Sequence, residues 1–472
     1  MILHRPQCFV LLISWLASFY ILWIVFCKLD NTNFFKAETY RGEKNWYNDE
    51  TAERNHSKRD KVVTEQPISM PLRNSSYKVS SLPVGEDIDV GKELEKIYAK
   101  QRCKPVENIL FIKTHKTGSS TVTNILNRFG DLRELRMAIP SAGDYRFQWP
   151  SKFHWTFADL LRLDGETANI FCNHARYNRE QMDVIMKKNT KYITILREPI
   201  SQFVSSFHYF EIDKILGLRH HKNPIEEFLK DPDKYLYSLS MRLGDLPDVM
   251  NLIQSGMMYD LGYDFLEFAH SQVVKNAIKK LENELDLVLI LEYFDESLVL
   301  MMRQFCWDFD DILYIKMNAM KYKKRKLNSK TREQILKWNA ADVALYKRFN
   351  QTFWDKIRKQ GKEFWDDVAE FKRRNADVRE ICSPAEVEQK AFRLNVTIKS
   401  LVLGQKVDRF HRSFCSKLMM DEVDYLDYFR YKFGRNYGYQ KILAREGFDL
   451  KKTGELREKL QKMRRRSVKI IL

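Results

Sequence analysis

The stretch NILFIKTHKTGSSTVTNILN, residues 108–127, decides how the chain folds. It begins with the apolar run 109–112, which is short and β-prone, as a buried strand of a parallel sheet is. The polar loop 113–118 follows, and apolar residues recur at helical spacing from Val122 onward. This order of strand, tight loop and helix points free backbone N–H groups and the positive end of the helix dipole into the loop. The stretch therefore predicts a binding site for phosphate or sulfate.

The side chains of this loop are those that hold such an anion at close range. Gly118 lets the backbone approach, Lys116 adds a compact positive charge, and hydroxyl donors come from Ser119, Ser120 and Thr121. The loop is not the P-loop of nucleotide hydrolases, because it lacks the pattern Gly-x-x-x-x-Gly-Lys-Ser/Thr. A polar helix cap without a ligand is the alternative interpretation, since Ser and Thr cap helices routinely.

The length and charge of the chain limit its class. Its 472 residues are enough for one large domain or two. The formal net charge of +17 indicates anionic partners, and nucleic acid, a membrane surface and phosphorylated small molecules all fit.

The N-terminal segment favours a membrane anchor. Residues 8–27 form an uncharged run of 20 residues, about the length that spans a bilayer as a helix. The run is longer than a signal-peptide core and no small-residue cleavage site follows it, so we expect a signal anchor. Residues 28–105 are polar and charged, as a stem is. We therefore expect a short cytoplasmic tail at residues 1–7 and a lumenal domain at residues 106–472.

Charge bias does not fix the orientation of this span. Arg5 precedes it, whereas Lys28, Lys36 and Arg41 follow it, which is the reverse of the positive-inside pattern. Glycosylation sequons beyond the span favour a lumenal body, and their acceptor residues are Asn55, Asn74, Asn350 and Asn395. The prediction is a single-pass type II membrane protein.

The cysteines predict a disulfide and a free thiol. Of seven cysteines, Cys8 and Cys27 belong to the predicted span. The odd number that remains predicts at least one free thiol or an intermolecular bridge in an oxidising lumen. Cys382 and Cys415 flank a single segment and are the preferred pair, although spacing alone does not fix connectivity. The sequence has no CxxC pair and no His/Cys cluster with zinc spacing, so we expect no metal site.

A second predicted strand ends in polar residues. Residues 169–172 lead into Asn173 and His174, and in open α/β sheets ligands bind beyond the carboxyl ends of the strands. His174 is therefore a candidate general base, with an unperturbed pKa close to neutrality. A purely structural histidine is the alternative.

A third strand leads into a second predicted anion site. The β-branched run 192–196 precedes Arg197, and Pro199 suits the first turn of a helix. A helix that starts there places Ser201 and Ser205 four residues apart on one face. Arg197 and a serine facing the helix N-terminus make a second phosphate site, unless they are a surface arginine and a solvated helix face. Two such sites predict a ligand with two separated phosphates.

Three ordered segments resemble the galactose 3-O-sulfotransferases, Golgi carbohydrate sulfotransferases that use 3′-phosphoadenosine 5′-phosphosulfate (PAPS). The segments are FIKTHKTGSST at 111–121, SSFHYF at 205–210 and EYFDESLVL at 292–300, with CW at 306–307 and DILYIKMN at 311–318. The resemblance runs from about residue 108 to residue 354, with a weaker tail beyond. It implies an α/β, P-loop-like sulfotransferase fold, a central parallel sheet flanked by helices, here preceded by a single transmembrane helix.

Carried over residue by residue, the resemblance implies that Lys116 stabilises the bridging oxygen of the leaving phosphate. His174 lies where related carbohydrate sulfotransferases place a histidine base, and His115 and His208 are next in line. The basic run 321–326 is either a solvated face or a contact near the 3′-phosphate or adenine of the donor. The residues implied to hold the 5′-phosphosulfate are Lys113, Thr117, Gly118, Ser119, Ser120 and Thr121, and those implied to hold the 3′-phosphate are Arg197 and Ser205.

The resemblance predicts metal-free sulfuryl transfer from PAPS to a hydroxyl, the 3-OH, of galactose in the Golgi lumen. The acceptor would be a glycolipid such as galactosylceramide or a galactose-terminated glycan; nucleic acid is not an expected partner, and a homo-oligomer is left open. Other hypotheses are a uronyl 2-O type of Golgi sulfotransferase, a glycan-binding protein without activity, and a cytosolic-facing nucleotide kinase. A DxD glycosyltransferase would use the triplets at 87–89 or 308–310.

Overall fold

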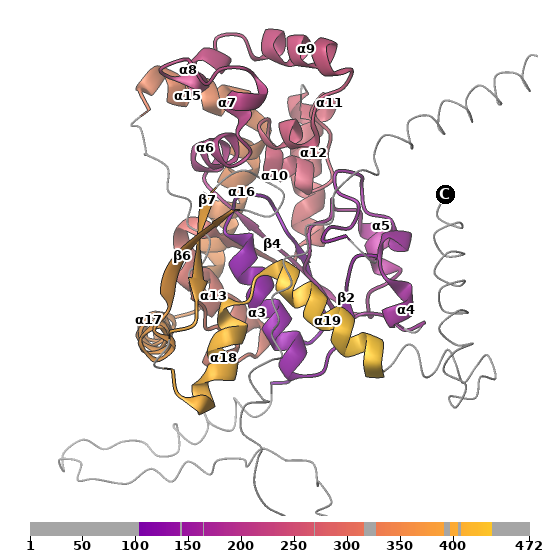
Figure 1. Ribbon diagram of the computed structural model, residues 1–472, viewed down its shortest axis with the longest axis vertical. Helices are drawn as coiled ribbons and strands as arrows, with labels where there is room; N and C mark the ends of the chain where they lie inside the picture. Colours follow the sequence, from indigo (N-terminus) through magenta and orange to yellow (C-terminus); the bar gives the residue numbers. More distant parts are fainter. Residues whose placement is uncertain are drawn as a thin grey trace, which may run out of the picture. The chain divides into compact units, whose positions relative to one another are not determined.

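The central sheet of the protein has β1 as its middle strand. The computed structural model describes residues 103–141, 144–163, 165–268, 270–315, 327–390, 397–404 and 407–436. Five parallel strands pair in the order β2-β3-β1-β4-β5. Figure 1 labels β2 and β4 of this sheet. Their bounds are β1 Ile109–Ile112, β2 Met137–Ala138, β3 Ile170–Phe171, β4 Lys191–Leu196 and β5 Leu287–Ile290. The expected strands at 109–112, 169–172 and 192–196 are thus confirmed, with β3 shorter than expected.

These strands are apolar because helices cover both faces of the sheet. All four side chains of β1 and of β5 are buried, and so are all those of β4 after Lys191. A continuous apolar run, without alternation, is what a parallel strand buried on two faces requires. In the pairing of β1 with β3, Ile109 lies opposite Ile170, and in the pairing of β4 with β5, Leu196 lies opposite Ile290.

Helices fill the connections between these strands. The longer ones are α3 Ser119–Leu132, α6 Pro199–Tyr209, α9 Pro232–Leu243, α12 Ser271–Glu284, α13 Phe294–Phe305, α15 Ser329–Trp338, α16 Ala340–Arg358, α17 Glu363–Cys382, α18 Arg409–Met419 and α19 Glu422–Asn436. The short ones are α4 Leu160–Leu163, α5 Arg179–Asp183, α7 Ile212–Ile215, α8 Pro224–Phe228, α10 Gly256–Asp260, α11 Phe265–Phe268 and α14 Phe309–Ile312. Three short 3-10 helices, η1 Trp155–Phe157, η2 Asp248–Leu252 and η3 Leu291–Tyr293, and the antiparallel hairpin of β6 Ala385–Lys390 and β7 Thr397–Val402 complete the described elements.

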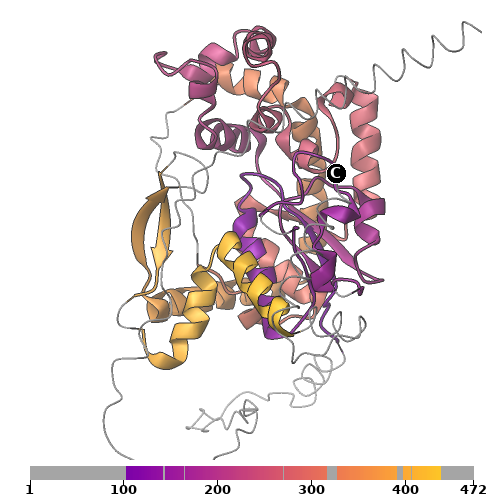
Figure 2. The ribbon, with the colours of Figure 1, turned by 45° about the vertical axis from the view of Figure 1, so that its right-hand side comes forward.

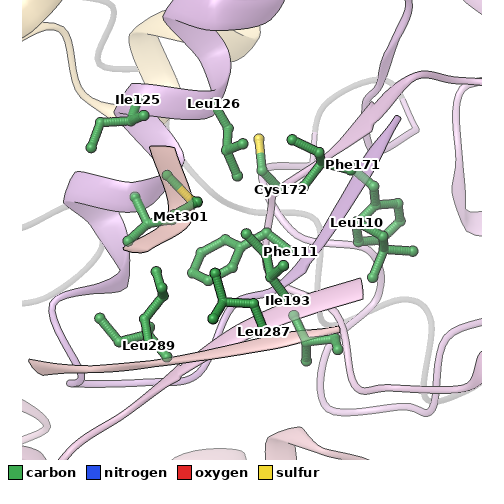
Figure 3. Close-up of a cluster of buried hydrophobic side chains, with 14 of the residues drawn as sticks. Leu110, Phe111, Ile125, Leu126, Phe171, Cys172, Ile193, Leu287, Leu289 and Met301 are labelled. Carbon is green, nitrogen blue, oxygen red and sulfur yellow. The ribbon is translucent and has the colours of Figure 1, made fainter. Parts of the chain in front are cut away.

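The main core lies between the sheet and helices α3 and α13. Figure 3 shows Leu126 of α3 and Met301 of α13 beside Phe111 and Leu289 of the strands, and all four side chains are fully buried. Crossovers of the same right-handed sense leave β1 and β4 toward opposite edges of the sheet, so α3 and α12 cover opposite faces. Helix α16 packs against α12 and β5.

A second apolar cluster supports helix α6. Its buried residues come from the stretch α6 to η2 and from α15; helices α6 to α9 and α15 lie together in Figure 2. Phe203 and Phe207 of α6 are fully buried there, with Phe228 of α8 and Ile335 of α15. Pro199 is the first residue of α6, as predicted. The cluster fixes α6 at the carboxyl end of β4, next to the loop that follows β1.

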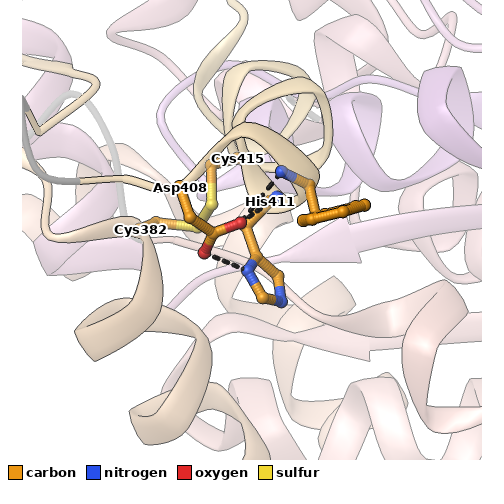
Figure 4. The surroundings of a disulfide bond; sticks show 5 residues. Cys382, Asp408, His411 and Cys415 are labelled. Carbon is orange, nitrogen blue, oxygen red and sulfur yellow. Dashed lines mark hydrogen bonds and ion pairs between the residues drawn. A yellow bond between two sulfur atoms is a disulfide. The ribbon is translucent and has the colours of Figure 1, made fainter.

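Two disulfides staple the fold. Cys382, the last residue of α17, is bonded to Cys415 of α18, which confirms the predicted pair (Figure 4). Beside this bond the Asp408 carboxylate caps α18 by accepting from the backbone N–H of Phe410 at 2.9 Å and of His411 at 3.1 Å. The second disulfide joins Cys103 to Cys306. Among the cysteines of the described residues, Cys172 is free and buried.

One buried carboxylate clamps the C-terminal helices onto α3. Asp131 is 2% exposed and binds Lys417 at 2.5 Å and Lys432 at 2.6 Å, and its Oδ1 accepts from the Tyr428 hydroxyl at 2.9 Å. The Asn124 amide, also on α3, donates to the carbonyl oxygens of Lys417 and Met420, both at 2.9 Å. These bonds hold α18 and α19 against α3.

Several predictions concern residues outside the described part of the chain. The span at 8–27, nearly all of the stem, the basic run 321–326, Asn55, Asn74 and Asn395 all lie there. No helix within the described ranges is long and apolar enough to cross a membrane. Asn350 lies half-buried within α16, and its buried side-chain oxygen has no hydrogen-bond partner among the residues that the structure describes. Glycosylation at all four asparagines stays a prediction.

Asp131→Ala should lower the free energy of unfolding by about 2 to 3 kcal/mol, because it leaves two ammonium groups and a hydroxyl without their partner. Urea unfolding measures the change. Asp427→Ala is the matched control, since this α19 carboxylate is 72% exposed and, within the described residues, forms an ion pair with Arg430 alone, at 3.2 Å. The control should change stability by less than about 0.5 kcal/mol. Equal effects would contradict the clamp.

Candidate active site

The middle position of β1 brings three predicted site segments to one edge of the sheet. The loop after β1 lies between the ends of β3 and β4, which pair with β1 on either side. The Arg197 guanidinium, just after β4, donates to the carbonyl oxygen of Lys116 at 2.9 Å. The ring of His174, beyond β3, stacks on that of His115 with centroids 4.1 Å apart. Residues far apart in sequence therefore form one site.

Two left-handed residues shape the loop after β1. Lys116 has φ 61° and Gly118 has φ 78°, so the chain turns sharply before α3. The hydroxyls of Thr114 and Thr117 lie 2.8 Å apart, and the Ser119 hydroxyl donates to the carbonyl oxygen of Thr114 at 2.6 Å. The hydroxyls of Thr117 and Ser119, both predicted donor contacts, thus hold the loop itself together. Ser120 and Thr121 are half-buried at the start of α3.

The N-terminus of α3 is open to an anion. Its N-cap is Gly118, and no side chain of the described residues caps the first turn. The N–H groups of that turn and the positive end of the helix dipole therefore face the loop. Lys113, only 1% exposed, lies within hydrogen-bond distance of the hydroxyls of Ser119 at 3.3 Å and Ser120 at 3.1 Å. Backbone donors, hydroxyls and ammonium groups are the groups that bind phosphate or sulfate oxygens.

Lys116 carries a proton that is easily lost. Its ammonium lies 3.3 Å from the centre of the Tyr209 ring, on the last residue of α6. Burial, and then the charges of Arg197 and Lys113, lower the pKa of Lys116 to about 7. An anion bound in the loop would oppose both effects, so we expect its binding to raise this pKa and to be stronger below pH 7 than above it.

His174 is nearly buried and neutral at physiological pH. Burial, and then the charges of His115, Lys113 and Arg146, hold the pKa of His174 well below its usual value. This corrects the expectation of an ionisation close to neutrality. Within the described part of the chain, the buried Nδ1 atom has no side-chain hydrogen-bond partner, and Nε2 lies 4.0 Å from Glu422 Oε1 of α19. A neutral imidazole is the form that accepts a proton.

His115 has the partners of an oriented base. Its Nδ1 lies 2.9 and 3.0 Å from the two carboxylate oxygens of Asp260, and its backbone N–H donates to Asp260 at 2.7 Å. The Trp149 indole donates to the same carboxylate at 3.0 Å. Asp260 is fully buried at the end of α10. A carboxylate that fixes one imidazole nitrogen leaves the other available, which is the arrangement of general bases.

The second predicted phosphate site is only partly as expected. Glu198 caps α6, because its carboxylate accepts from the backbone N–H of Ile200 at 3.1 Å and of Ser201 at 2.8 Å. The Ser201 hydroxyl also donates to Glu198, at 2.7 Å. The N–H groups at the start of α6 and the Ser201 hydroxyl are therefore taken up by a carboxylate of the chain, so Ser201 does not face a free helix end. Arg197 and the buried Ser205 remain as the predicted contacts.

Sequence reasoning missed the residues that reach the site from outside the motifs. Tyr209 lies within the motif at 205–210, which implies no role for it, and Asp260 and Glu422 follow no pattern that links them to the loop. In sequence, Asp421 and Glu422 indicate only the start of a helix. The Asp308 triplet, in turn, has a structural use, because Asp308 is the N-cap of α14 and its N–H donates to the Asp311 carboxylate at 3.0 Å.

Comparison with known proteins identifies the family. A family model described as Galactose-3-O-sulfotransferase matches residues 69–433, well over half of the chain. The chain belongs to this family. The match begins within the predicted stem and extends past the start of α19, so it is longer at both ends than the motifs.

Individual relatives agree with the family match. The galactosylceramide sulfotransferase of Mus musculus is 34% identical over 339 residues, which cover 69% of this chain and 78% of the relative. Galactose-3-O-sulfotransferase 2 of Mus musculus is 30% identical, over 68% of this chain and 84% of the relative. Galactose-3-O-sulfotransferase 3 of Homo sapiens is 33% identical over 55% of this chain and 61% of the relative.

Gly118→Ala should lower the free energy of unfolding of this sulfotransferase by about 2 to 3 kcal/mol. Left-handed backbone is unfavourable for alanine, and the added Cβ would lie 2.6 Å from Leu291 Cδ1. Gly217→Ala is the matched control, with φ 73° and no atom within 4 Å of the new Cβ. It should cost only the backbone part, about 1 kcal/mol. Equal losses in urea unfolding would show that the contact with Leu291 does not constrain the loop.

Proposed function

We propose that the protein transfers a sulfuryl group from PAPS to a hydroxyl, the 3-OH, of galactose on a glycolipid or a glycan. The observation that carries the proposal is the open N-terminus of α3 with Lys116 and Arg197 beside it and His174 near by. The family of the chain, Galactose-3-O-sulfotransferase, supports the same reaction. The relatives named for galactosylceramide and for galactose support the acceptor class.

In this proposal the two anionic ends of the donor bind two different strand ends. The first turn of α3, with Ser120 and Thr121, holds the 5′-phosphosulfate. Arg197 and Ser205 hold the 3′-phosphate, and the bond from Arg197 to the Lys116 carbonyl fixes the distance between the two sites. Bound PAPS supplies an activated sulfuryl group, and the chain supplies position and charge.

The residues of the chain then divide the chemistry of the transfer. His174 accepts the proton of the galactose hydroxyl as its oxygen forms a bond to sulfur. The bond that breaks joins sulfur to the bridging oxygen of the 5′-phosphate, and protonated Lys116 offsets the charge that develops there. Sulfuryl transfer resembles phosphoryl transfer, in which positioning and charge stabilisation dominate. In the proposed mechanism, fixed cations and backbone donors supply both, and no step uses a metal.

We also propose that the domain faces the Golgi lumen as part of a type II membrane protein anchored by residues 8–27. The two disulfides are consistent with an oxidising compartment. Glycan occupancy at any of the four sequons in protein from mammalian cells would support this orientation. A protein that stays unglycosylated and exposed to protease on the cytosolic side of sealed vesicles would contradict it.

The direct test is sulfate transfer from radiolabelled PAPS to a panel of glycolipids, galactose-terminated glycans and uronic acid polymers. We expect label on galactose, at O3 by linkage analysis, with Lys116→Ala as the inactive control. Label on a uronic acid would favour the uronyl 2-O type. Transfer from a nucleotide sugar with manganese would favour a glycosyltransferase. Donor binding without any transfer would favour a binding protein.

Truncation of either catalytic side chain should lower the turnover number by on the order of 10²- to 10⁴-fold, with a smaller change in the Michaelis constants. The two residues should be separable by pH. kcat/KM for the donor should fall above pH 7, where Lys116, with its pKa of about 7 in the free protein, loses its proton. It should also fall on the acidic side, below the usual pKa of histidine, where His174 becomes protonated.

Two variants test which residue causes the fall of kcat/KM at alkaline pH (the alkaline limb) and which causes the fall at acidic pH (the acidic limb). Lys116→Arg keeps a positive charge at all accessible pH values, so the alkaline limb should move up by several pH units while reduced activity remains. His174→Ala should lose the acidic limb. A normal turnover number and an unchanged acidic limb in His174→Ala would show that the base lies elsewhere, with His115 and then His208 as the next residues to test.

A further inference from the structure

A carboxylate that the proposed mechanism does not use lies beside the proposed base. Glu422 is the first residue of α19, and its side chain is 19% exposed. Oε1 lies 4.0 Å from His174 Nε2, and Oε2 lies 3.2 Å from Lys113 Nζ. The carboxylate therefore stands between the base and a lysine of the donor loop.

The position of this carboxylate is fixed from both sides. Asn124 of α3 donates to the carbonyl oxygen of Met420 just before α19, and Asp131 of α3 binds Lys417 of α18 and Lys432 farther along α19. The Asp421 carboxylate accepts from the backbone N–H groups of Val423 and Asp424, both at 2.9 Å. Lys113 is itself almost fully buried and held by two serine hydroxyls. Glu422 is thus presented to the site by rigid elements.

The carboxylate has unused capacity as a hydrogen-bond acceptor. Oε2 is buried and has no hydrogen-bond partner in the described part of the chain, although Lys113 forms an ion pair with it. An ionised carboxylate can accept about four hydrogen bonds and donates none. The ion pair keeps Oε2 beside Lys113, so Oε1, the oxygen nearer His174, is the one that can accept a hydrogen bond from a ligand.

We propose that Glu422 binds an acceptor hydroxyl next to the one that is sulfated. Proton transfer to His174 requires the reacting oxygen within about 2.8 Å of Nε2. Neighbouring hydroxyl oxygens on a sugar ring lie about as far apart as two hydrogen-bonded oxygens, about 2.8 Å. A base nitrogen and a carboxylate oxygen 4.0 Å apart can therefore hold the two hydroxyls of one vicinal diol. Glu422 makes the site specific for a sugar edge with two free hydroxyls.

The test combines changes in the acceptor with changes in Glu422. It rests on the proposed function and uses the full-length protein with a soluble galactoside and its 2-deoxy and 4-deoxy analogues. In the unmodified protein, one deoxy analogue should react with kcat/KM about 10- to 100-fold below the parent, the size of a lost hydrogen bond to a charged group. In Glu422→Gln the parent should fall toward that level and the preference for the hydroxyl should shrink to a few-fold. The affinity for 3′-phosphoadenosine 5′-phosphate should change little.

Two further variants keep the test decisive. Asp427→Asn removes an exposed carboxylate of the same helix and should keep the full preference of the unmodified protein. Glu422→Asp retains the charge but shortens the reach, and should lose most of the preference, even if the glutamine variant is too unstable to assay.

Each outcome has a clear meaning. A preference that survives in Glu422→Gln overturns the inference and leaves the proposed function intact. The inference is also overturned if Glu422→Gln binds 3′-phosphoadenosine 5′-phosphate more tightly and keeps its acceptor preference. Glu422 would then act by competing with the donor for Lys113. Failure of the unmodified protein to sulfate any galactoside overturns both proposals.

Discussion

The parallel pairing of β1 with β3 on one side and β4 on the other is the constraint on which the site depends. Parallel strands in one sheet all end at the same edge, so the three segments that follow them must meet there. The pairing is held by buried backbone hydrogen bonds and by side chains that reach across, such as the Thr194 hydroxyl, which donates to the Ile112 carbonyl at 2.8 Å. Without this arrangement Lys116, His174 and Arg197 would be residues of three unrelated loops.

Electrostatics is the second theme of the site, because several charges are removed from water in a small volume. Lys113 is stabilised by Glu422 and two serines, and His115 by Asp260, so each of these groups has a fixed partner. Lys116 has an aromatic ring and cationic neighbours instead, and its pKa is lowered to about 7. The fold thus places one incompletely compensated cation at the mouth of an open helix N-terminus, which is where an anionic ligand gains most from binding.

Much of this arrangement was predictable from sequence, because it follows from local patterns. The sequence predicted the strands around residues 109–112 and 192–196 and the helix after Gly118. It also predicted the start of α6 at Pro199 and the disulfide between Cys382 and Cys415. The family resemblance implied the roles of Lys116, His174 and Arg197 at the edge of the sheet. The contacts that depend on tertiary packing were not readable: Glu198 capping α6, Asp260 holding His115, and Glu422 reaching the site from about 300 residues away. The lowered pKa of His174 has the same origin, since burial and neighbouring charges leave no trace in a short motif.

The central claim is that one ligand with two anionic ends binds across the ends of β1 and β4. An experimental structure of the protein with 3′-phosphoadenosine 5′-phosphate tests this most directly. The account predicts the 5′-phosphate at the first turn of α3, within about 3 Å of backbone N–H groups and of Lys116 Nζ, and the 3′-phosphate at Arg197 and Ser205. A nucleotide bound away from the α3 N-terminus, or with its phosphates contacting neither Lys116 nor Arg197, would contradict it.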